Sequence, residues 1–188
     1  NAWIQSVKRR PGDVALVDTE GAEFTASQAL TVSLLLAKRF RKLTPDRYLG
    51  LLLPTSSGAV LANMATLLAG KAVVNLNYTA HQAALASALT QAEITTVVTS
   101  RRFVEILQKR GLKVDQLLAN THTVYLEDLH ATMGRAERLR TWLAVRLLPS
   151  WLIQRLYCRA HDADATAALL FSSGSEGDPK GVLLSHCN

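Results

Sequence analysis

The sequence predicts an α/β fold in which a doubly wound, mainly parallel sheet is flanked by helices. Short apolar runs alternate with helical patterns along the chain, and many of these runs end at Pro, Gly, Ser or Thr. The 188 residues are 48% hydrophobic but only 6% aromatic. Strands and helices that alternate at this spacing are typical of parallel sheets, because each parallel crossover needs a connecting helix. The length is sufficient for one domain with a substantial core.

A hairpin and a long helix are expected first. "VALVD" at 14–18 and "EFT" at 23–25 flank the turn "TEG" and have the pattern of two short strands. Thr25 followed three residues later by Gln28 forms a capping box, which predicts a helix over 26–43.

The remaining elements alternate between strand and helix. Further strands are expected at 48–54, 71–78, 94–100, 124–129 and 166–173, and helices at 55–70, 79–92 and 101–111. The last strand leads directly into a segment rich in Gly and Ser. In parallel sheets ligands bind beyond the carboxyl ends of the strands, so this segment is the first candidate for a binding site.

The candidate loop is "FSSGSEGDPKG", residues 171–181. Gly174 and Gly177 can adopt positive φ, which lets consecutive backbone N–H groups converge on an anion. Hydroxyls and one ammonium group add further donors for phosphate oxygens. The candidate phosphate-binding residues are Ser172, Ser173, Gly174, Ser175, Gly177 and Lys180. The alternative is a surface turn with a solvated lysine, and the spacing does not fit a Walker motif.

The stretch "LLFSSGSEGDPKGVLLSH" resembles the phosphate-loop signature of the adenylate-forming superfamily. That superfamily includes acyl-CoA synthetases and peptide-synthetase adenylation domains. The positions that match the signature are Ser172, Ser173, Gly174, Ser175, Gly177, Pro179, Lys180, Gly181 and Val182. Glu176 departs from it, standing where most members carry Thr or Ser, and no phosphate contact is assigned to Glu176.

The resemblance extends over most of the chain. "FTASQALTVSLLLAKRF" is similar to an early helix of the family, with Ala26 and Gln28 in place of Tyr and Glu. "GLLLPTSSGAVLANMATLLAGKAVVNLNYT" is similar to a later block, with Asn75 in place of Pro. The resemblance implies that residues 1–188 are the N-terminal portion of an adenylate-forming large domain.

A narrower resemblance is carried by "NLNYT", "VVTSRRFVE", "VYLEDL" and "GSEG". These stretches are similar to one branch, the bifunctional 2-acylglycerophosphoethanolamine acyltransferase/acyl-carrier-protein synthetases of Gram-negative bacteria. The branch implies ATP and Mg2+, a fatty acid that is activated as an acyl-adenylate, and acyl carrier protein as the thiol acceptor. It also implies re-acylation of lysophospholipid at the cytoplasmic face of the inner membrane.

No catalytic residue is assigned within this chain. The adenine-side motif, the ribose-binding Asp, the hinge and the catalytic Lys of the superfamily are expected later in a longer protein. The acyltransferase half needs a His with an Asp five positions later, and no histidine of this chain has one. We therefore expect the chain alone to be inactive. Two alternatives stay open: another acyl-CoA synthetase or adenylation domain, and a non-catalytic module that tethers a partner to a membrane.

Positive charge is concentrated in residues 134–160, which form a basic, Trp- and Leu-rich helical insertion. This segment contains six arginines and one glutamate, so its net charge is +5, while the net charge of the whole chain is +6. The rest is nearly neutral, which argues against a nucleic-acid-binding surface. A helix pair broken at Pro149 could contact anionic lipid or acidic acyl carrier protein, or could simply pack with a solvated basic rim. The candidate contact residues are Arg138, Trp142, Arg146, Trp151 and Arg155.

The remaining candidates are given structural roles. Cys158 and Cys187 have neither pairing nor metal-site spacing, so we interpret them as inert thiols in a reducing, cytoplasmic setting. His186 is interpreted as structural. His161, Asp162 and Asp164 resemble a metal cluster in composition, but their position in a linker favours solvated charge, and no metal site is assigned.

Overall fold

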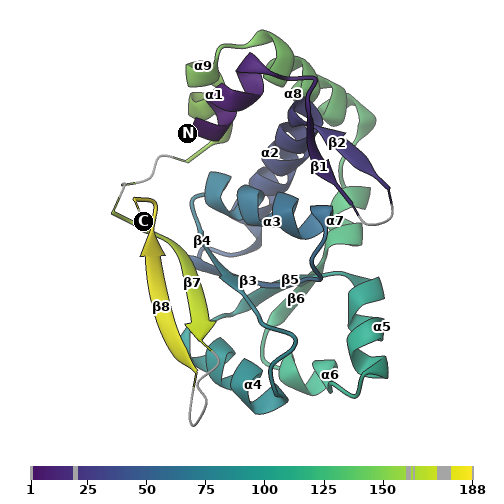
Figure 1. The fold of residues 1–188 in the computed structure, drawn as a ribbon, viewed down its shortest axis with the longest axis vertical. Coiled ribbons are helices and arrows are strands. Elements are labelled where there is room, and N and C mark those ends of the chain that lie inside the picture. Colours follow the sequence, from purple (N-terminus) through teal and green to yellow (C-terminus); the bar gives the residue numbers. More distant parts are fainter. Residues whose placement is uncertain (1, 19–20, 160–161, 163, 173–178, 188) are drawn as a thin grey trace. The chain divides into compact units, whose positions relative to one another are not determined.

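The structure, a computed structural model, describes residues 2–18, 21–159, 162, 164–172 and 179–187 (Figure 1). The chain divides into two units. The first consists of Asn1–Leu43, Thr55–Gly70 and Ala131–Ala160, and the second of Thr44–Pro54, Lys71–His130 and His161–Asn188. Each unit is built from chain segments that are separated in the sequence, and each is described by itself below.

A mixed sheet forms the second unit. Within the described ranges its strands are β3 (Tyr48–Leu52), β4 (Ala72–Asn75), β5 (Thr96–Thr99), β6 (His122–Tyr125), β7 (Thr166–Ser172) and β8 (Lys180–Ser185). Their order across the sheet is β6-β5-β3-β4-β7-β8 (Figure 1). All neighbours pair in parallel except β8, which is antiparallel to β7. The predicted α/β fold with a mainly parallel sheet is confirmed.

The helices of this unit are α4 (Gln82–Gln91), α5 (Arg101–Lys109), α6 (Val114–Leu117) and most of α7 (Leu126–Ala131). Strand β5 is buried along its whole length and β3 along most of it, as expected of central parallel strands. Side chains from β3, β4, β5 and β7 form one hydrophobic core with α4, α5 and α6, in which Val97, Leu85 and Leu107 are almost fully buried. This core fixes the strand ends from which the candidate loop leaves.

Strand β3 contains a glycine because the neighbouring strand is too close for a side chain. A Cβ on Gly50 would lie 3.0 Å from Ile94 Cγ2 and 3.1 Å from Val97 Cγ2. Interiors are packed tightly enough that such contacts force neighbouring groups to shift. Gly50 therefore allows the side chains at the start of β5 to pack over β3.

The first unit is a helical layer with a small hairpin. Its elements are α1 (Ala2–Arg9), β1 (Val14–Val17), β2 (Glu23–Thr25), α2 (Ala26–Leu43), α3 (Ser57–Leu68), α8 (Arg135–Leu147) and α9 (Ser150–Tyr157). Helix α2 contacts every other helix of the unit. The predicted capping box is present, because Gln28 N donates to Thr25 Oγ1 at 3.3 Å and Thr25 N donates to Gln28 Oε1 at 2.8 Å.

The prediction of one strand over 124–129 is wrong in its second half. β6 ends at Tyr125, and α7 begins at Leu126. Two acidic residues stand in the first turn of α7, where the helix dipole favours negative charge. They also have partners, since Arg101 N donates to Glu127 at 2.9 Å and Arg101 Nη2 pairs with Asp128 at 2.6 Å. Helices α1 and α6 and strand β8 are further elements that the sequence patterns did not predict.

A buried lysine binds the backbone of the segment that precedes β3. Lys71 is only 7% exposed, and its Nζ donates to Thr44 O at 2.7 Å and to Asp46 O at 2.6 Å. The Asp46 carboxylate also accepts a hydrogen bond from the Thr95 hydroxyl. This bond, followed by a side-chain hydrogen bond between Asp46 and Thr44, lowers the pKa of Asp46. Hydrogen bonds to a charged donor are stronger than neutral ones. Lys71 thus ties the residue before β4 to the residues before β3.

We predict that Lys71→Met lowers the free energy of unfolding by about 2 kcal/mol, because two backbone carbonyls lose a charged donor. Thermal and urea unfolding of the variant and the parent measure this difference. Lys109→Met, at an exposed position in α5, is the matched control and is expected to change stability by less than about 0.5 kcal/mol. Equal effects of the two substitutions would contradict the structural role of Lys71.

Candidate functional site

The hairpin β7–β8 carries the candidate phosphate loop. Its register places Ser172, the last residue of β7, directly opposite Lys180, the first residue of β8. The two ends of the loop are therefore held side by side by the antiparallel ladder. Two of the six predicted phosphate-binding residues are brought together in this way. The other four, Ser173, Gly174, Ser175 and Gly177, lie outside the described residues.

Pairing with β4 decides where the loop leaves the sheet. Val73 pairs with Ala168 and Val74 with Leu169, so β7 runs parallel to β4 and ends at the same edge. This is the carboxyl edge of all five parallel strands, where ligands bind in sheets of this kind. Pro179 is buried and Lys180 is exposed at this position. Lys180 thus stands at the start of β8, where the chain rejoins the sheet after the candidate loop, and it is exposed there.

Gly181 explains how the hairpin packs. It lies opposite Phe171, and a Cβ at Gly181 would be 3.1 Å from Leu169 Cδ1 and 3.3 Å from Phe171 Cε1. Phe171 in turn packs against the hydrophobic core of the second unit. The absence of a side chain at Gly181 therefore leaves room for the Phe171 ring that anchors the carboxyl end of β7. The sequence resemblance marked Gly181 as a family position but gave no physical reason for it.

The neighbouring strand ends supply polar groups at the same edge. Asn77 follows β4, and its Oδ1 accepts hydrogen bonds from Thr79 N at 3.1 Å and Thr79 Oγ1 at 2.7 Å. Tyr78 packs edge-on against Phe103, with ring centroids 5.0 Å apart. Ser100 caps α5 after β5 by accepting from Phe103 N. Asn77 and Tyr78 shape the turn after β4, the neighbour of β7, and Ser100 shapes the turn after β5. All three lie within the stretches "NLNYT" and "VVTSRRFVE" that resemble the family branch, but sequence reasoning gave them no role in a site.

The second candidate surface is the pair α8 and α9 in the first unit. The predicted helix break is confirmed, because Pro149 is the N-cap of α9. Buried Thr141, Val145 and Ile153 mark the packed sides of the two helices. Four of the five predicted contact residues, Trp142, Arg146, Trp151 and Arg155, are exposed.

Arg138, the fifth predicted contact residue, is less exposed than the other four. It is half-buried and lies at i, i+3 and i+7 spacing with Thr141 and Val145, so it belongs to the packed side of α8. Arg138 therefore differs in exposure from the other four candidates, and its role as a contact residue stays a prediction.

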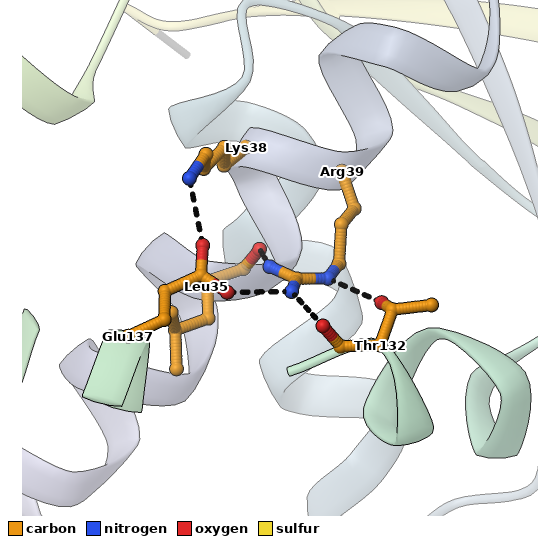
Figure 2. Close-up of polar contacts among 5 residues, drawn as sticks. All are labelled: Leu35, Lys38, Arg39, Thr132 and Glu137. Carbon is orange, nitrogen blue, oxygen red and sulfur yellow. Dashed lines mark hydrogen bonds and ion pairs between the residues drawn. The ribbon is translucent and has the colours of Figure 1, made fainter. Parts of the chain in front are cut away.

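Figure 2 shows how α2 holds the first turn of α8. Arg39 Nη2 pairs with Glu137 Oε2 at 2.8 Å, and Lys38 Nζ pairs with Glu137 Oε1 at 2.7 Å. Arg39 also donates to Leu35 O, to Thr132 Oγ1 and to Thr132 O (Figure 2). Hydrogen bonds from Arg39, followed by those from Lys38, lower the pKa of Glu137 from 4.5 to about 2. The one acidic residue in the basic segment is therefore neutralised by α2.

The other end of α8 is held by α1. Lys8 Nζ donates to Val145 O at 3.1 Å and to Arg146 O at 2.9 Å. A cation near the last carbonyl groups of a helix also interacts favourably with the helix dipole. Both ends of α8 thus have charged partners on other helices of the same unit.

The remaining candidates that the structure describes form no cluster suited to catalysis. Both cysteines are free, and burial raises the pKa of the Cys158 thiol, which disfavours its nucleophilic thiolate form. His161 lies outside the described residues, while Asp162 and Asp164 are exposed and joined by a hydrogen bond from Asp164 N. His186 is exposed, and its backbone amide donates to Ala165 O. Among the helices described, none combines the length and apolarity needed to cross a bilayer.

A family model described as "AMP-binding enzyme" matches residues 3–188. Two curated relatives are similar in sequence. The chain is 31% identical to the nonribosomal peptide synthetase vlms of Lecanicillium sp. over 142 residues, which are 76% of this chain and 1% of that protein. It is 29% identical to nonribosomal peptide synthetase 8 of Aspergillus fumigatus over 184 residues, which are 97% of this chain and 2% of that protein.

A solved structure has the same fold. It is the o-succinylbenzoate CoA synthetase (MenE) from Bacillus subtilis in complex with its acyl-adenylate intermediate. The TM-score is 0.69 at 19% sequence identity, over 97% of this chain and 42% of that chain. The chain therefore spans less than half the length of this synthetase and a few per cent at most of its curated relatives.

We predict that Gly181→Val destabilises the hairpin by about 1 to 3 kcal/mol, because the new side chain collides with Leu169 and Phe171. The measurement is the melting temperature of the variant against the parent. Gly12→Val is the control, since a Cβ at Gly12 meets no atom within 4 Å. A Gly181 variant as stable as the control variant would show that the Phe171 contact is dispensable.

The Glu137 cluster predicts a pH dependence of stability. A carboxylate whose pKa is lowered on folding contributes stability that is fully present above its unfolded pKa, here 4.5. That contribution is lost as the pH falls through about 2. Glu137→Gln should therefore cost about 2 kcal/mol at pH 7, and the cost should shrink steadily below pH 4.5.

Urea unfolding at a series of pH values tests this, with exposed Glu105→Gln as the control. A difference between Glu137→Gln and the parent that is the same at pH 7 and pH 3 would contradict the ion-pair account.

Proposed function

Because the chain belongs to the AMP-binding enzyme family, we propose that it is part of an ATP-dependent acyl-acyl-carrier-protein synthetase. In this proposal a fatty acid is activated as an acyl-adenylate, and its acyl group passes to acyl carrier protein. The complete protein then uses the acyl group to re-acylate lysophosphatidylethanolamine at the cytoplasmic face of the bacterial inner membrane.

The observation that carries the proposal is the position of Ser172 and Lys180, the described residues that flank the candidate loop. The loop connects β7 to β8 at the carboxyl edge of a parallel sheet, and Ser172 and Lys180 face each other across its ends. The Gly- and Ser-rich composition between them supplies donors of the kind that bind phosphate oxygens. Lys180 supplies a positive charge at the same place. We assign this loop to the β- and γ-phosphates of ATP.

The proposed reaction has two steps. An oxygen of the fatty-acid carboxylate bonds to the α-phosphorus of ATP, and the bond between the α-phosphorus and the bridging oxygen breaks to release pyrophosphate. The carrier-protein thiolate then bonds to the acyl carbon, and AMP leaves with its phosphate oxygen. Lys180 and the loop donors act in the first step, where they stabilise the negative charge on the departing pyrophosphate.

In the proposed reaction, Mg2+ is bound to the phosphate oxygens of ATP. Among the residues that the structure describes, no three His, Cys, Asp or Glu side chains gather to hold a metal ion. No residue of this chain is therefore assigned to Mg2+, and no step depends on one.

The choice of acceptor rests on sequence resemblance. "NLNYT" and "GSEG" support the branch that uses acyl carrier protein and is fused to an acyltransferase. Two named relatives are nonribosomal peptide synthetases, and a similar structure is a CoA synthetase, which supports the rival proposals of amino-acid adenylation or CoA as acceptor. In this proposal the remaining substrate sites and the acyltransferase belong to a longer protein of which residues 1–188 are a part. For that reason we expect no adenylation by residues 1–188 alone.

The proposal is tested by exchange of labelled pyrophosphate into ATP, measured with the full-length protein. Exchange should require a fatty acid, and Lys180→Ala should lower its rate by about 100-fold, the usual effect of removing one charge-stabilising donor. Lys109→Ala, at an exposed position on α5, is the matched control and should leave the rate unchanged.

Assays with different acids and different thiol acceptors distinguish the alternative functions. Exchange with amino acids but not with fatty acids would replace the proposal by amino-acid adenylation. Transfer to CoA but not to acyl carrier protein would identify an acyl-CoA synthetase. A folded protein with no exchange on any acid would favour a non-catalytic tethering module.

A further inference from the structure

We propose that the exposed faces of α8 and α9 bind peripherally to an anionic phospholipid surface. This inference concerns the first unit and is independent of the adenylation chemistry. The proposed partner is a membrane. Binding of these faces to the carrier protein is the alternative that the experiment below distinguishes.

Helix α8 carries a row of exposed leucines. Leu139, Leu143 and Leu147 follow one another at i and i+4 spacing, which places them along one side of the helix. Leu147 is 75% exposed and Leu139 is 57% exposed. Large apolar side chains that gather on a surface mark sites of protein or membrane interaction.

Arginines border the leucine row on both sides. At about 100° per residue, Arg135 and Arg146 fall on one side of the row and Arg140 on the other. All three are exposed. Arg146 also lies over the ring of Trp142, with its Cζ 5.7 Å from the ring centroid. An apolar centre with cationic borders and a tryptophan at one edge is the pattern of helices that lie in the membrane interface.

Helix α9 carries exposed residues of the same three types, Trp, Leu and Arg, within its eight residues. Trp151 is 62% exposed and Leu156 is 58% exposed, and Arg155 between them is also exposed. At about 100° per residue, buried Ile153 lies on the side of the helix opposite Trp151 and Arg155. Only Leu148 and Pro149 separate α9 from α8, so the two faces belong to one short stretch of chain.

The exposed faces carry no opposing charge. Glu137 is the one acidic residue of 134–160, and it is paired with Lys38 and Arg39 of α2. The charge offered to a partner is therefore purely positive, which complements anionic headgroups. An acidic protein would satisfy the arginines, but a bilayer also accepts the leucines and tryptophans into the boundary between headgroups and acyl chains. For this reason the structure favours lipid over a carrier protein.

The test is flotation of the 188-residue chain with vesicles of phosphatidylethanolamine and phosphatidylglycerol, and separately with phosphatidylcholine vesicles. The leucine variant is Leu139→Ser/Leu143→Ser/Leu147→Ser, and the arginine variant is Arg140→Gln/Arg146→Gln/Arg155→Gln. We expect binding to the anionic vesicles alone, weakened by at least tenfold in the leucine variant. In the arginine variant we expect a loss of about 100-fold at low salt.

Matched controls remove equal numbers of exposed side chains elsewhere. These are Val14→Ser/Val17→Ser/Val60→Ser for the leucines and Arg9→Gln/Arg10→Gln/Arg110→Gln for the arginines. Circular dichroism confirms that each variant is folded, and the same variants in the full-length protein should show the same order of vesicle affinities. If the parent chain does not float with anionic vesicles, or if variants and controls bind equally, the proposal is wrong.

A second measurement locates the contact directly. In Trp3→Phe/Trp142→Phe, the remaining Trp151 should be quenched by brominated phospholipid in anionic vesicles. Absence of quenching in a vesicle-bound sample would place the contact elsewhere and overturn the proposal. Loss of acyl-carrier-protein binding in both variants, with vesicle binding intact, would assign this surface to the carrier protein instead.

Discussion

Parallel pairing is the constraint on which the candidate site depends. Strands β3 to β7 all run in the same direction, so each must be followed by a crossover before the next strand begins. The carboxyl ends of five strands consequently meet at one edge. Residues that are far apart in the sequence, such as Asn77, Ser100 and Ser172, follow or end strands at that edge. The antiparallel β8 then returns the chain so that Lys180 lies beside Ser172.

The sequence predicted the features that local patterns encode. The capping box at Thr25 and Gln28, the buried parallel strands and the break at Pro149 all depend on residues close in the chain. The candidate loop was located because an apolar run, predicted to be a strand, leads directly into a run of Gly and Ser. For the same reason the fold class could be predicted without any knowledge of long-range contacts.

What the sequence did not reveal depends on contacts between distant segments. "VYLEDL" has an apolar pattern that fits either a strand or a helix, and the switch at Leu126 is favoured by Arg101, which pairs with Glu127 and Asp128. Strand β8 starts at a loop residue, and its pairing with β7 gives it extended structure that its own pattern did not predict. The half-burial of Arg138 could not be read from composition, because burial depends on the angle of each arginine around the helix.

The first unit has a consequence for biosynthesis. It is assembled from three stretches of chain, and the Glu137 that pairs with Arg39 is translated long after α2. At roughly 5 to 20 residues per second, α2 waits several seconds or more on the ribosome for its partners on α8. During that time α2, which carries the fully buried Phe40, lacks the contacts with α8 and α9 that it makes in the folded protein. The helical unit can close only after its last helix has emerged from the ribosome, so the folding of α2 is completed late in the synthesis of this chain.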